Sequence, residues 1–163
     1  MSKLSKLRLL LEVSYARLED IPDILSLHEV SFSKDALELR RSELEKIIGS
    51  SDSKILVCRI RDSFAGYMIM VEPRFRPWTN GEYLAVRRGH AGKGAAAILM
   101  EEGMRLAKRP FVRILVRPSN VSALKLYRRY GFVKAGCKRG FYADGEDAIV
   151  LLRATFWVRS RFR

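Results

Sequence analysis

The sequence predicts one α/β domain with a central, twisted, mixed sheet of about seven strands flanked by about four helices. Three observations carry this prediction. Strand-type and helix-type apolar patterns follow one another over the 163 residues in the order β-α-α-β-β-β-α-β-α-β-β. A glycine-rich turn at residues 92–94 directly follows an apolar strand and precedes a long helix, which is typical of a parallel β-α-β unit. The first half instead contains a short turn between two strands, which indicates antiparallel pairing.

The first half of the chain is expected to supply one strand, two helices and three further strands. Alternating apolar and polar residues at 12–16 indicate the first strand. Asp20 and Pro22 mark the start of the first helix, and Gly49 ends a second one predicted over residues 35–48. A hairpin turn follows at Asp62-Ser63. The remaining strands are predicted at residues 54–61, 64–72 and 82–86, with residues 73–81 as a loop.

The second half is expected to alternate helices with strands. A long helix over residues 92–108 ends before Pro110, and a shorter helix runs from Pro118 to Tyr130, where Gly131 ends it. This order of elements places helices on both faces of the sheet. The strands of this half are predicted at residues 111–117, 132–137 and 148–152.

Composition excludes several classes of protein. A hydrophobic fraction of 48% argues against intrinsic disorder, and no apolar run approaches the roughly 20 residues of a membrane helix. The apolar run at residues 9–11 is too short for a signal-peptide core, so we expect a cytoplasmic protein without a membrane partner. Cys58 and Cys137 do not indicate a disulfide framework, and His28 and His90 lack ligand-type neighbours, so no metal is expected.

Positive charge is concentrated at the two ends of a chain whose formal net charge is +13. We therefore divide the chain into a basic N-terminal extension (residues 1–10), a folded domain (11–153) and a basic, aromatic C-terminal tail (154–163). Such ends commonly contact polyanions. RNA or the ribosome is the favoured partner, and a role in solubility alone is the alternative. The basic residues concerned are Lys3, Lys6, Arg8, Arg153, Arg159, Arg161 and Arg163.

The glycine turn predicts a phosphate site. The run Gly92-Lys93-Gly94-Ala95-Ala96 follows the strand residues Leu84-Ala85-Val86 and opens a helix, whose first N–H groups lack partners at the positive end of the helix dipole. Such N–H groups bind phosphate without a particular side chain, so a ligand with a pyrophosphate is the first hypothesis. A tight turn without a ligand is the alternative. The spacing matches neither the P-loop nor the dinucleotide-binding fingerprint.

Two further blocks follow the glycine turn. They are Ser119-Asn120-x-x-Ala123-x-x-x-Tyr127-x-x-Tyr130-Gly131-Phe132 and Tyr142-Ala143-Asp144-Gly145-Glu146-Asp147-Ala148. Together with the turn, in this order and spacing, they resemble the GNAT family of acyl-CoA N-acyltransferases over nearly the whole chain, to about Arg153. With Phe141 included, the last block resembles the protein N-terminal acetyltransferases, both the bacterial RimI type and the catalytic subunit of archaeal and eukaryotic NatA.

The resemblance implies the GNAT fold and acetyl-CoA as the cofactor. It implies that the CoA pyrophosphate binds the N–H groups of the turn and that the pantetheine arm adds to the free edge of the preceding strand. Asn120 is implied to contact pantetheine, with helix capping as its alternative role. Ala91 stands where the family usually has Arg or Gln, so weaker CoA binding is expected. The predicted cofactor-binding residues are Leu84, Ala85, Val86, Ala91, Gly92, Lys93, Gly94, Ala95, Ala96, Asn120 and Tyr127.

Tyr127 is the residue that the resemblance implies as the general acid, which returns a proton to the CoA thiolate. A phenol with a reference pKa of about 10 suits this role. Ala123, Tyr127 and Tyr130 share one helix face, and Tyr130 is expected in the core. A packing role alone is the alternative for Tyr127.

No general base is carried over from the family. Leu115 stands where RimI-type and archaeal relatives keep a glutamate, Asn80 where some archaeal relatives carry histidine, and Lys34 near the acid of NatA-type relatives. Glu82, two residues after Asn80 on the same strand face, is the predicted replacement, with a solvated surface acid as the alternative. About a tenth of an α-amino group is neutral at pH 7, against about one part in a few thousand of a lysine, so a weak base favours N-terminal acetylation.

The predicted acceptor site contains Phe32, Asp35, Phe141 and Tyr142, and the acidic residues after Tyr142 are predicted to help to position the substrate. The protein is therefore predicted to transfer acetyl from acetyl-CoA to the N-terminal α-amino group of proteins or peptides, by direct attack, as a monomer or homodimer. A first alternative is acetylation of a lysine, a polyamine or another small amine. A second alternative is a catalytically weak CoA-binding module associated with RNA or the ribosome.

Overall fold

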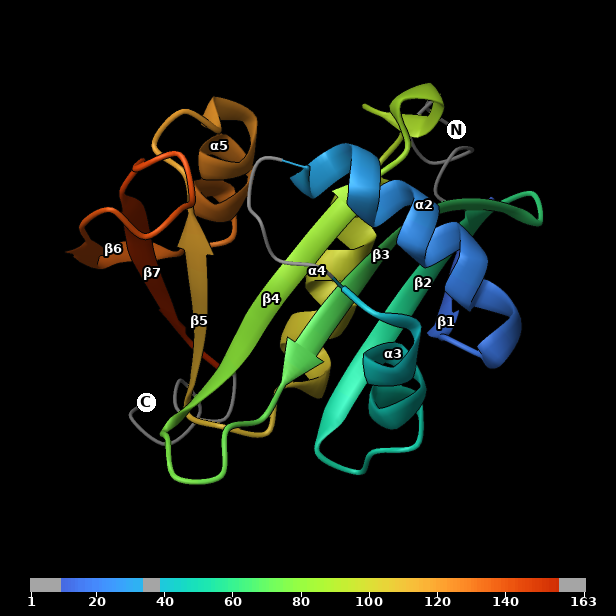
Figure 1. Cartoon of the computed structure of the whole chain (residues 1–163), viewed down its shortest axis with the longest axis horizontal. Helices are drawn as coiled ribbons and strands as arrows, with labels where there is room; N and C mark the ends of the chain where they lie inside the picture. Colours follow the sequence, from blue (N-terminus) through green and yellow to red (C-terminus); the bar gives the residue numbers. More distant parts are fainter. Residues whose placement is uncertain (1–9, 34–38, 156–163) are drawn as a thin grey trace, which may run out of the picture.

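The computed structural model describes residues 10–33 and 39–155, which form one sheet with helices on both sides (Figure 1). The strands are β1 (Leu11–Tyr15), β2 (Ser53–Ile60), β3 (Ser63–Val71), β4 (Trp78–Val86), β5 (Phe111–Val116), β6 (Val133–Lys138) and β7 (Ala148–Ala154). The helices of this part of the chain are α2 (Ile21–Phe32), α3 (Arg41–Ile48), α4 (Ala95–Leu106) and α5 (Val121–Arg129), with two short 3-10 helices, η1 (Leu18–Asp20) and η2 (Arg88–His90).

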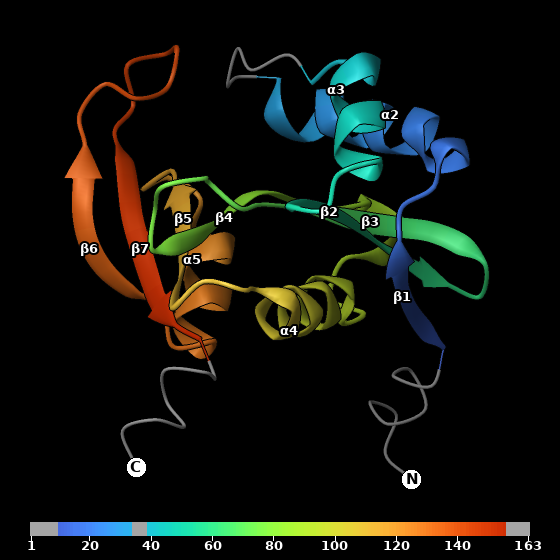
Figure 2. The ribbon, with the colours of Figure 1, turned by 90° about the horizontal axis from the view of Figure 1, so that it is seen from below.

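Strand directions make the sheet mixed. The strands lie in the order β1-β2-β3-β4-β5-β7-β6, with β4 and β5 parallel and every other neighbouring pair antiparallel. Helix α4 connects the parallel pair, as a crossover connection requires. Helices α2 and α3 cover one face of the sheet, and α4 and α5 cover the other (Figure 2). The predicted fold class and order of elements are confirmed.

Strands β2 and β3 are buried on both faces, which explains why their sequences are almost continuously apolar. On one face, Met68 packs in a core with Leu99 of α4. On the other face, Tyr67 packs in a second core with Leu44 of α3. Cys58 lies fully buried in β2. The two cores hold both helix layers against the sheet.

The parallel strands β4 and β5 pair only over their first halves. The ladder runs from Trp78–Phe111 to Gly81–Ile114 and then stops, so the ends of the two strands diverge (Figure 1). A β-bulge in β4 lies at the same point, because Ile69 of β3 faces Tyr83 while Met70 faces Gly81. Glu82 is therefore the extra residue of the bulge, at the start of the divergence, which we call the β4–β5 split.

Several predicted boundaries are wrong. Strand β4 begins at Trp78, inside the predicted loop 73–81, because pairing with β5 extends it beyond what the local pattern indicates. Helix α3 begins at Arg41 rather than residue 35, and residues 34–38 lie outside the described residues. Helix α4 begins at Ala95 rather than residue 92, because the glycines before it adopt positive φ angles.

Membrane-spanning segments and metal clusters are both missing from the described residues. No helix there is long and apolar enough to cross a bilayer. No group of three or more His, Cys, Asp or Glu side chains in the same residues is arranged to hold a metal ion.

Candidate active site

The glycine turn presents unpaired backbone N–H groups at the start of α4. Gly92 and Gly94 have φ angles of 73° and 93°, which explains why glycine stands at both positions. Gly94 is the N-cap of α4, and the structure gives no acceptor among the described residues for the N–H groups of Gly92 and residues 94–97. Since these groups lie at the positive end of a twelve-residue helix, the turn is suited to bind an anion.

Side chains contribute little to the surface of this turn. Residues 91–94 are exposed, whereas the methyl group of Ala95 is buried beneath them. The Nζ atom of Lys93 donates a hydrogen bond to the carbonyl oxygen of Gly89 at 2.8 Å. The predicted cofactor residues 91–96 therefore lie together, with backbone groups as their common feature.

A cavity of about 250 Å³ passes through the β4–β5 split, with Tyr127 of α5 at one side and Val30 and Phe32 at the end of α2 at the other; we call it the cavity on the α5 side. Beyond Gly81, the edge of β4 that faces β5 has no ladder partner, so its backbone groups are free to bind an extended ligand. Of the predicted strand residues, Leu84 lines this cavity, whereas the Ala85 side chain is buried in the core beneath α2 and Val86 packs against the core beneath α4.

Asn120 caps helix α5. Its Oδ1 atom accepts hydrogen bonds from the N–H of Ala123 at 3.1 Å and from the hydroxyl of Ser122 at 3.0 Å. Helix capping, the alternative role predicted for Asn120, is thus confirmed. Asn120 also lines the cavity at the split, so its contact with pantetheine stays a prediction.

Tyr127 lines the same cavity from α5. Its side chain is buried, and its ring packs against Phe132 with a centroid distance of 5.7 Å. Burial raises the pKa of Tyr127 above its usual value, and the nearby Tyr142 raises it further. The hydroxyl group therefore stays protonated at neutral pH. Tyr130 is only half-buried, contrary to its expected place in the core, and its hydroxyl lies 3.1 Å from the carbonyl oxygen of Ala97 on α4.

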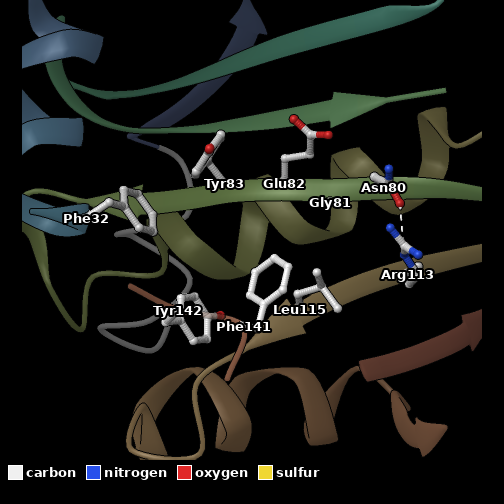
Figure 3. A pocket seen from close by; sticks show the side chains of 9 residues that line it. All are labelled: Phe32, Asn80, Gly81, Glu82, Tyr83, Arg113, Leu115, Phe141 and Tyr142. Carbon is white, nitrogen blue, oxygen red and sulfur yellow. Dashed lines mark hydrogen bonds between the residues drawn. The ribbon is translucent and has the colours of Figure 1, made fainter. Parts of the chain in front are cut away.

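A second cavity, of about 350 Å³, opens on the side of α2 (Figure 3). Its walls are mainly aromatic, with polar side chains toward one end. Its lining residues are Phe32, Asn80, Gly81, Glu82, Tyr83, Arg113, Leu115, Phe141 and Tyr142. Three of the four predicted acceptor residues are among them, and the fourth, Asp35, lies outside the described residues.

The two cavities meet at the split. Both are lined by Gly81 and Glu82 of β4, by Leu115 of β5, and by Phe32 and Tyr142. An extended ligand on the α5 side and a second molecule on the α2 side would therefore reach the same point in the molecule. Such a junction suits a transfer between two substrates.

Glu82 lies at this junction because the bulge adds one residue to β4. Its side chain is open to the cavity, yet the surrounding protein raises the pKa of its carboxyl group, and Arg113 partly opposes that effect. A carboxylate with a raised pKa accepts protons more readily than an ordinary one. Leu115, at the position where relatives keep a glutamate, presents only an apolar side chain to the same point.

Arg117 fastens the β6–β7 loop to the end of β5. Its guanidinium group donates to Asp144 at 2.9 Å and to Glu146 at 2.8 Å, and it lies 3.8 Å above the ring of Tyr142. Glu146 also accepts a hydrogen bond from the N–H of Ser119 at 2.8 Å. The acids of this loop thus bind the protein itself, and they position Tyr142 by holding its loop.

Sequence reasoning missed Arg117, Tyr83 and Arg113. The ring centroids of Tyr83 and Phe32 lie 5.2 Å apart, and Tyr83 lines the cavity on the α2 side. The sequence gives little indication of their roles, because an arginine or tyrosine in a strand is common and its role depends on neighbours that only the fold reveals. The role of Arg117 was indicated only by Asp144 and Glu146, two acids about thirty residues later that have no basic residue beside them in the sequence.

Comparisons with known proteins agree with this geometry. The family model described as "Acetyltransferase (GNAT) family" matches residues 21–132. An N-alpha-acetyltransferase of Saccharolobus solfataricus is 29% identical over 85% of this chain and 89% of its own length. A putative [ribosomal protein bS18]-alanine N-acetyltransferase of Bacillus subtilis is 27% identical over 83% and 89%. The crystal structure of Ard1 from Thermoplasma volcanium superposes with a TM-score of 0.78 at 18% identity, over 90% of this chain and 99% of that one. The chain therefore belongs to the GNAT acetyltransferase family, which implies an enzyme that takes its acyl group from acyl-CoA.

Proposed function

We propose that this enzyme transfers an acetyl group from acetyl-CoA to the N-terminal α-amino group of proteins or peptides. One observation carries the proposal: a cavity that reaches from α5 through the β4–β5 split meets a second cavity on the α2 side of the sheet. The donor then binds on the α5 side and the acceptor on the α2 side. Two similar proteins named for N-terminal acetylation, one archaeal and one bacterial, support this acceptor.

The residues on the α5 side fit acetyl-CoA. The unpaired N–H groups at the start of α4 suit its diphosphate, and the free edge of β4 suits its amide-containing arm. When bound, acetyl-CoA supplies an acetyl group activated as a thioester. Ala91 provides no charged side chain here, so backbone groups carry most of the binding.

Proton transfers in the proposed reaction fall to two side chains at the junction. The Glu82 carboxylate accepts a proton from the attacking amine, directly or through water. The Tyr127 hydroxyl, held protonated by its burial, donates a proton to the departing sulfur. The acetyl group gains a bond to nitrogen and loses its bond to sulfur, so the two proton transfers balance the reaction.

Direct attack by the amine fits the positions of the cysteines. Cys58 is buried in β2, where burial raises the pKa of its thiol to about 11. Cys137 lies on β6 and lines neither cavity. A thiol that stays protonated, or that lies away from the acetyl donor, cannot carry the acetyl group as a covalent intermediate.

A panel of acceptors tests the proposal. We would measure CoA release by the purified full chain with lysine-free peptides that have a free N-terminus, with the same peptides blocked at the N-terminus, with blocked peptides that contain lysine, and with spermidine. Turnover only with free N-termini is expected. Turnover with blocked lysine peptides or spermidine, and none with free N-termini, would favour the small-amine alternative. Binding of acetyl-CoA without any turnover would favour the non-catalytic alternative.

We also propose that residues 11–153 form the catalytic domain and that the basic ends contact RNA or the ribosome. Residues 1–9 and 156–163 lie outside the described residues, and β7 reaches Ala154, one residue past the proposed boundary. Affinity for ribosomes that does not fall between low and moderate salt would count against this contact.

A further inference from the structure

Arg113 is a fixed cation at the polar end of the acceptor cavity. It lies on β5, half-buried, and its Nε atom donates a hydrogen bond to Oδ1 of Asn80 at 3.1 Å (Figure 3). Its guanidinium group lies 4.9 Å from the ring centre of Trp78. Because Asn80 and Trp78 hold the side chain, binding a ligand there costs little conformational entropy.

No acid in the described residues forms an ion pair with Arg113. By contrast, Arg117, which lines the other cavity, pairs with Asp144 and Glu146. Burial and the neighbouring Arg76 lower the pKa of Arg113, and Glu82 opposes them, yet an arginine stays charged at neutral pH. The two terminal nitrogens of the Arg113 guanidinium group therefore remain available to an anion that enters the cavity.

Among the described residues, the lining of this cavity carries one charge of each sign. Glu82 lies at the junction, where the proposed reaction places the acceptor's amino group, and Arg113 pairs in the β4–β5 ladder with Asn80, two residues before Glu82 on β4. Two strand residues span about 7 Å, which is the reach of a side chain on the first or second residue of a peptide. A molecule with an ammonium group and a carboxylate at that spacing matches both charges.

We propose that Arg113 binds a side-chain carboxylate in the first two residues of the acceptor, so that the enzyme prefers proteins with an acidic N-terminal sequence. This inference rests on the proposed function and specifies its substrate. The carboxylate accepts a pair of hydrogen bonds from the Arg113 guanidinium group, which is the strongest geometry for such a contact. The α-ammonium group lies toward Glu82, which removes its proton before attack.

The test compares peptides that differ by one group. We would measure kcat/KM of the full chain with peptides carrying Asp or Asn, and Glu or Gln, at position 1 and separately at position 2. The acidic peptide is expected to exceed its amide counterpart by about tenfold at one of these positions, mainly through KM. Arg113→Gln should remove this preference, so that each acidic peptide and its amide counterpart give kcat/KM values within about twofold of each other.

Two variants control the test. Arg105→Gln removes the same charge from α4, on the opposite face of the sheet, and should keep the wild-type preference. Arg113→Lys keeps the positive charge but loses the forked geometry of the guanidinium group, so it should keep part of the preference for acidic peptides. A partial preference in this variant shows that the loss in Arg113→Gln comes from the missing charge and not from misfolding.

Distinct results overturn the inference and the proposed function. If wild-type enzyme acetylates acidic and amide peptides equally, or if Arg113→Gln keeps the tenfold preference, Arg113 is not the carboxylate site and the proposed function still stands. If no peptide with a free N-terminus is acetylated while spermidine or lysine is, both are wrong.

Discussion

The glycine turn before α4 and the unpaired edge of β4 offer mainly main-chain groups, whereas the cavity on the α2 side is lined by aromatic and charged side chains. On the α5 side, the N–H groups that follow Gly92 and Gly94 and the open edge of β4 face the ligand position. On the α2 side, Phe32, Tyr83 and Arg113 come from three different elements.

This difference explains how one fold serves many acceptors. A diphosphate and an extended amide chain are recognised by a backbone conformation, which many sequences can adopt. An acceptor is recognised by particular side chains, which substitution changes without disturbing the sheet. Changes on the α5 side should therefore alter donor binding alone, and changes on the α2 side should alter acceptor use alone.

Tyr127→Phe should cause the largest effect, because Tyr127 lies where the two sides meet. We expect kcat to fall about 100-fold, since loss of a general acid typically costs at least this much, with KM for acetyl-CoA changed less than about twofold. Steady-state kinetics with a free N-terminal peptide would measure both. Unchanged turnover would reduce Tyr127 to a packing role against Phe132.

Glu82→Gln should lower kcat/KM by about tenfold at neutral pH and alter its pH dependence. The base form of Glu82 is required, so the wild-type rate rises as pH increases through its pKa. Because desolvation by the surrounding protein raises that pKa, this rise occurs at higher pH than for an ordinary carboxyl group. A pH–rate profile with the same lower limb in the variant would rule out Glu82 as the base.

Gly94→Ala should weaken acetyl-CoA binding about fivefold and leave the acceptor KM unchanged. A side chain at a φ angle of 93° costs about 1 kcal/mol, and the new Cβ would lie 3.3 Å from Leu11 Cδ1, so the turn must shift its N–H groups. Gly89→Ala is the matched control, because its Cβ meets nothing within 4 Å. Calorimetric titration with CoA would compare them, and equal affinities would contradict a backbone-built site.

Glu146→Gln should raise the KM for the acceptor peptide about twofold to threefold, the smallest of these effects. The change weakens the bond from Arg117 and loosens the loop that carries Tyr142, but Asp144 still binds Arg117. Glu102→Gln, which removes an exposed ion-pair carboxylate on α4, should leave both Michaelis constants unchanged. A larger rise in the acetyl-CoA KM than in the peptide KM would place this loop on the donor side.

Much of the donor site could be predicted from the sequence. The turn at residues 92–94 needs glycine for its positive φ angles, and this need is visible in the glycines themselves. Tyr127 was predicted through the resemblance of the block from Ser119 to Phe132 to the GNAT family, and most of that block lies on one helix, α5. Such features depend on neighbours within a few residues, so the sequence displays them.

The acceptor site was predicted only in part. Phe32, Phe141 and Tyr142 were expected, and they do line the cavity. Arg113 was missed, because nothing near it in the sequence indicates that Trp78 and Asn80 hold it in a cavity. Both contacts form across the β4–β5 ladder, whose first half lies in a stretch predicted to be a loop.

The order of helices and strands, the mixed sheet and the glycine turn with positive φ angles follow from local periodicity and backbone preference, so the sequence by itself determined them. Tertiary structure alone decided where β4 leaves β5 and that Glu82 becomes the extra residue of a bulge. It alone paired Arg117 with acids 27 and 29 residues away and gave Arg113 no acidic partner among the described residues. These outcomes depend on strand register and on contacts between distant residues, which local sequence patterns do not encode.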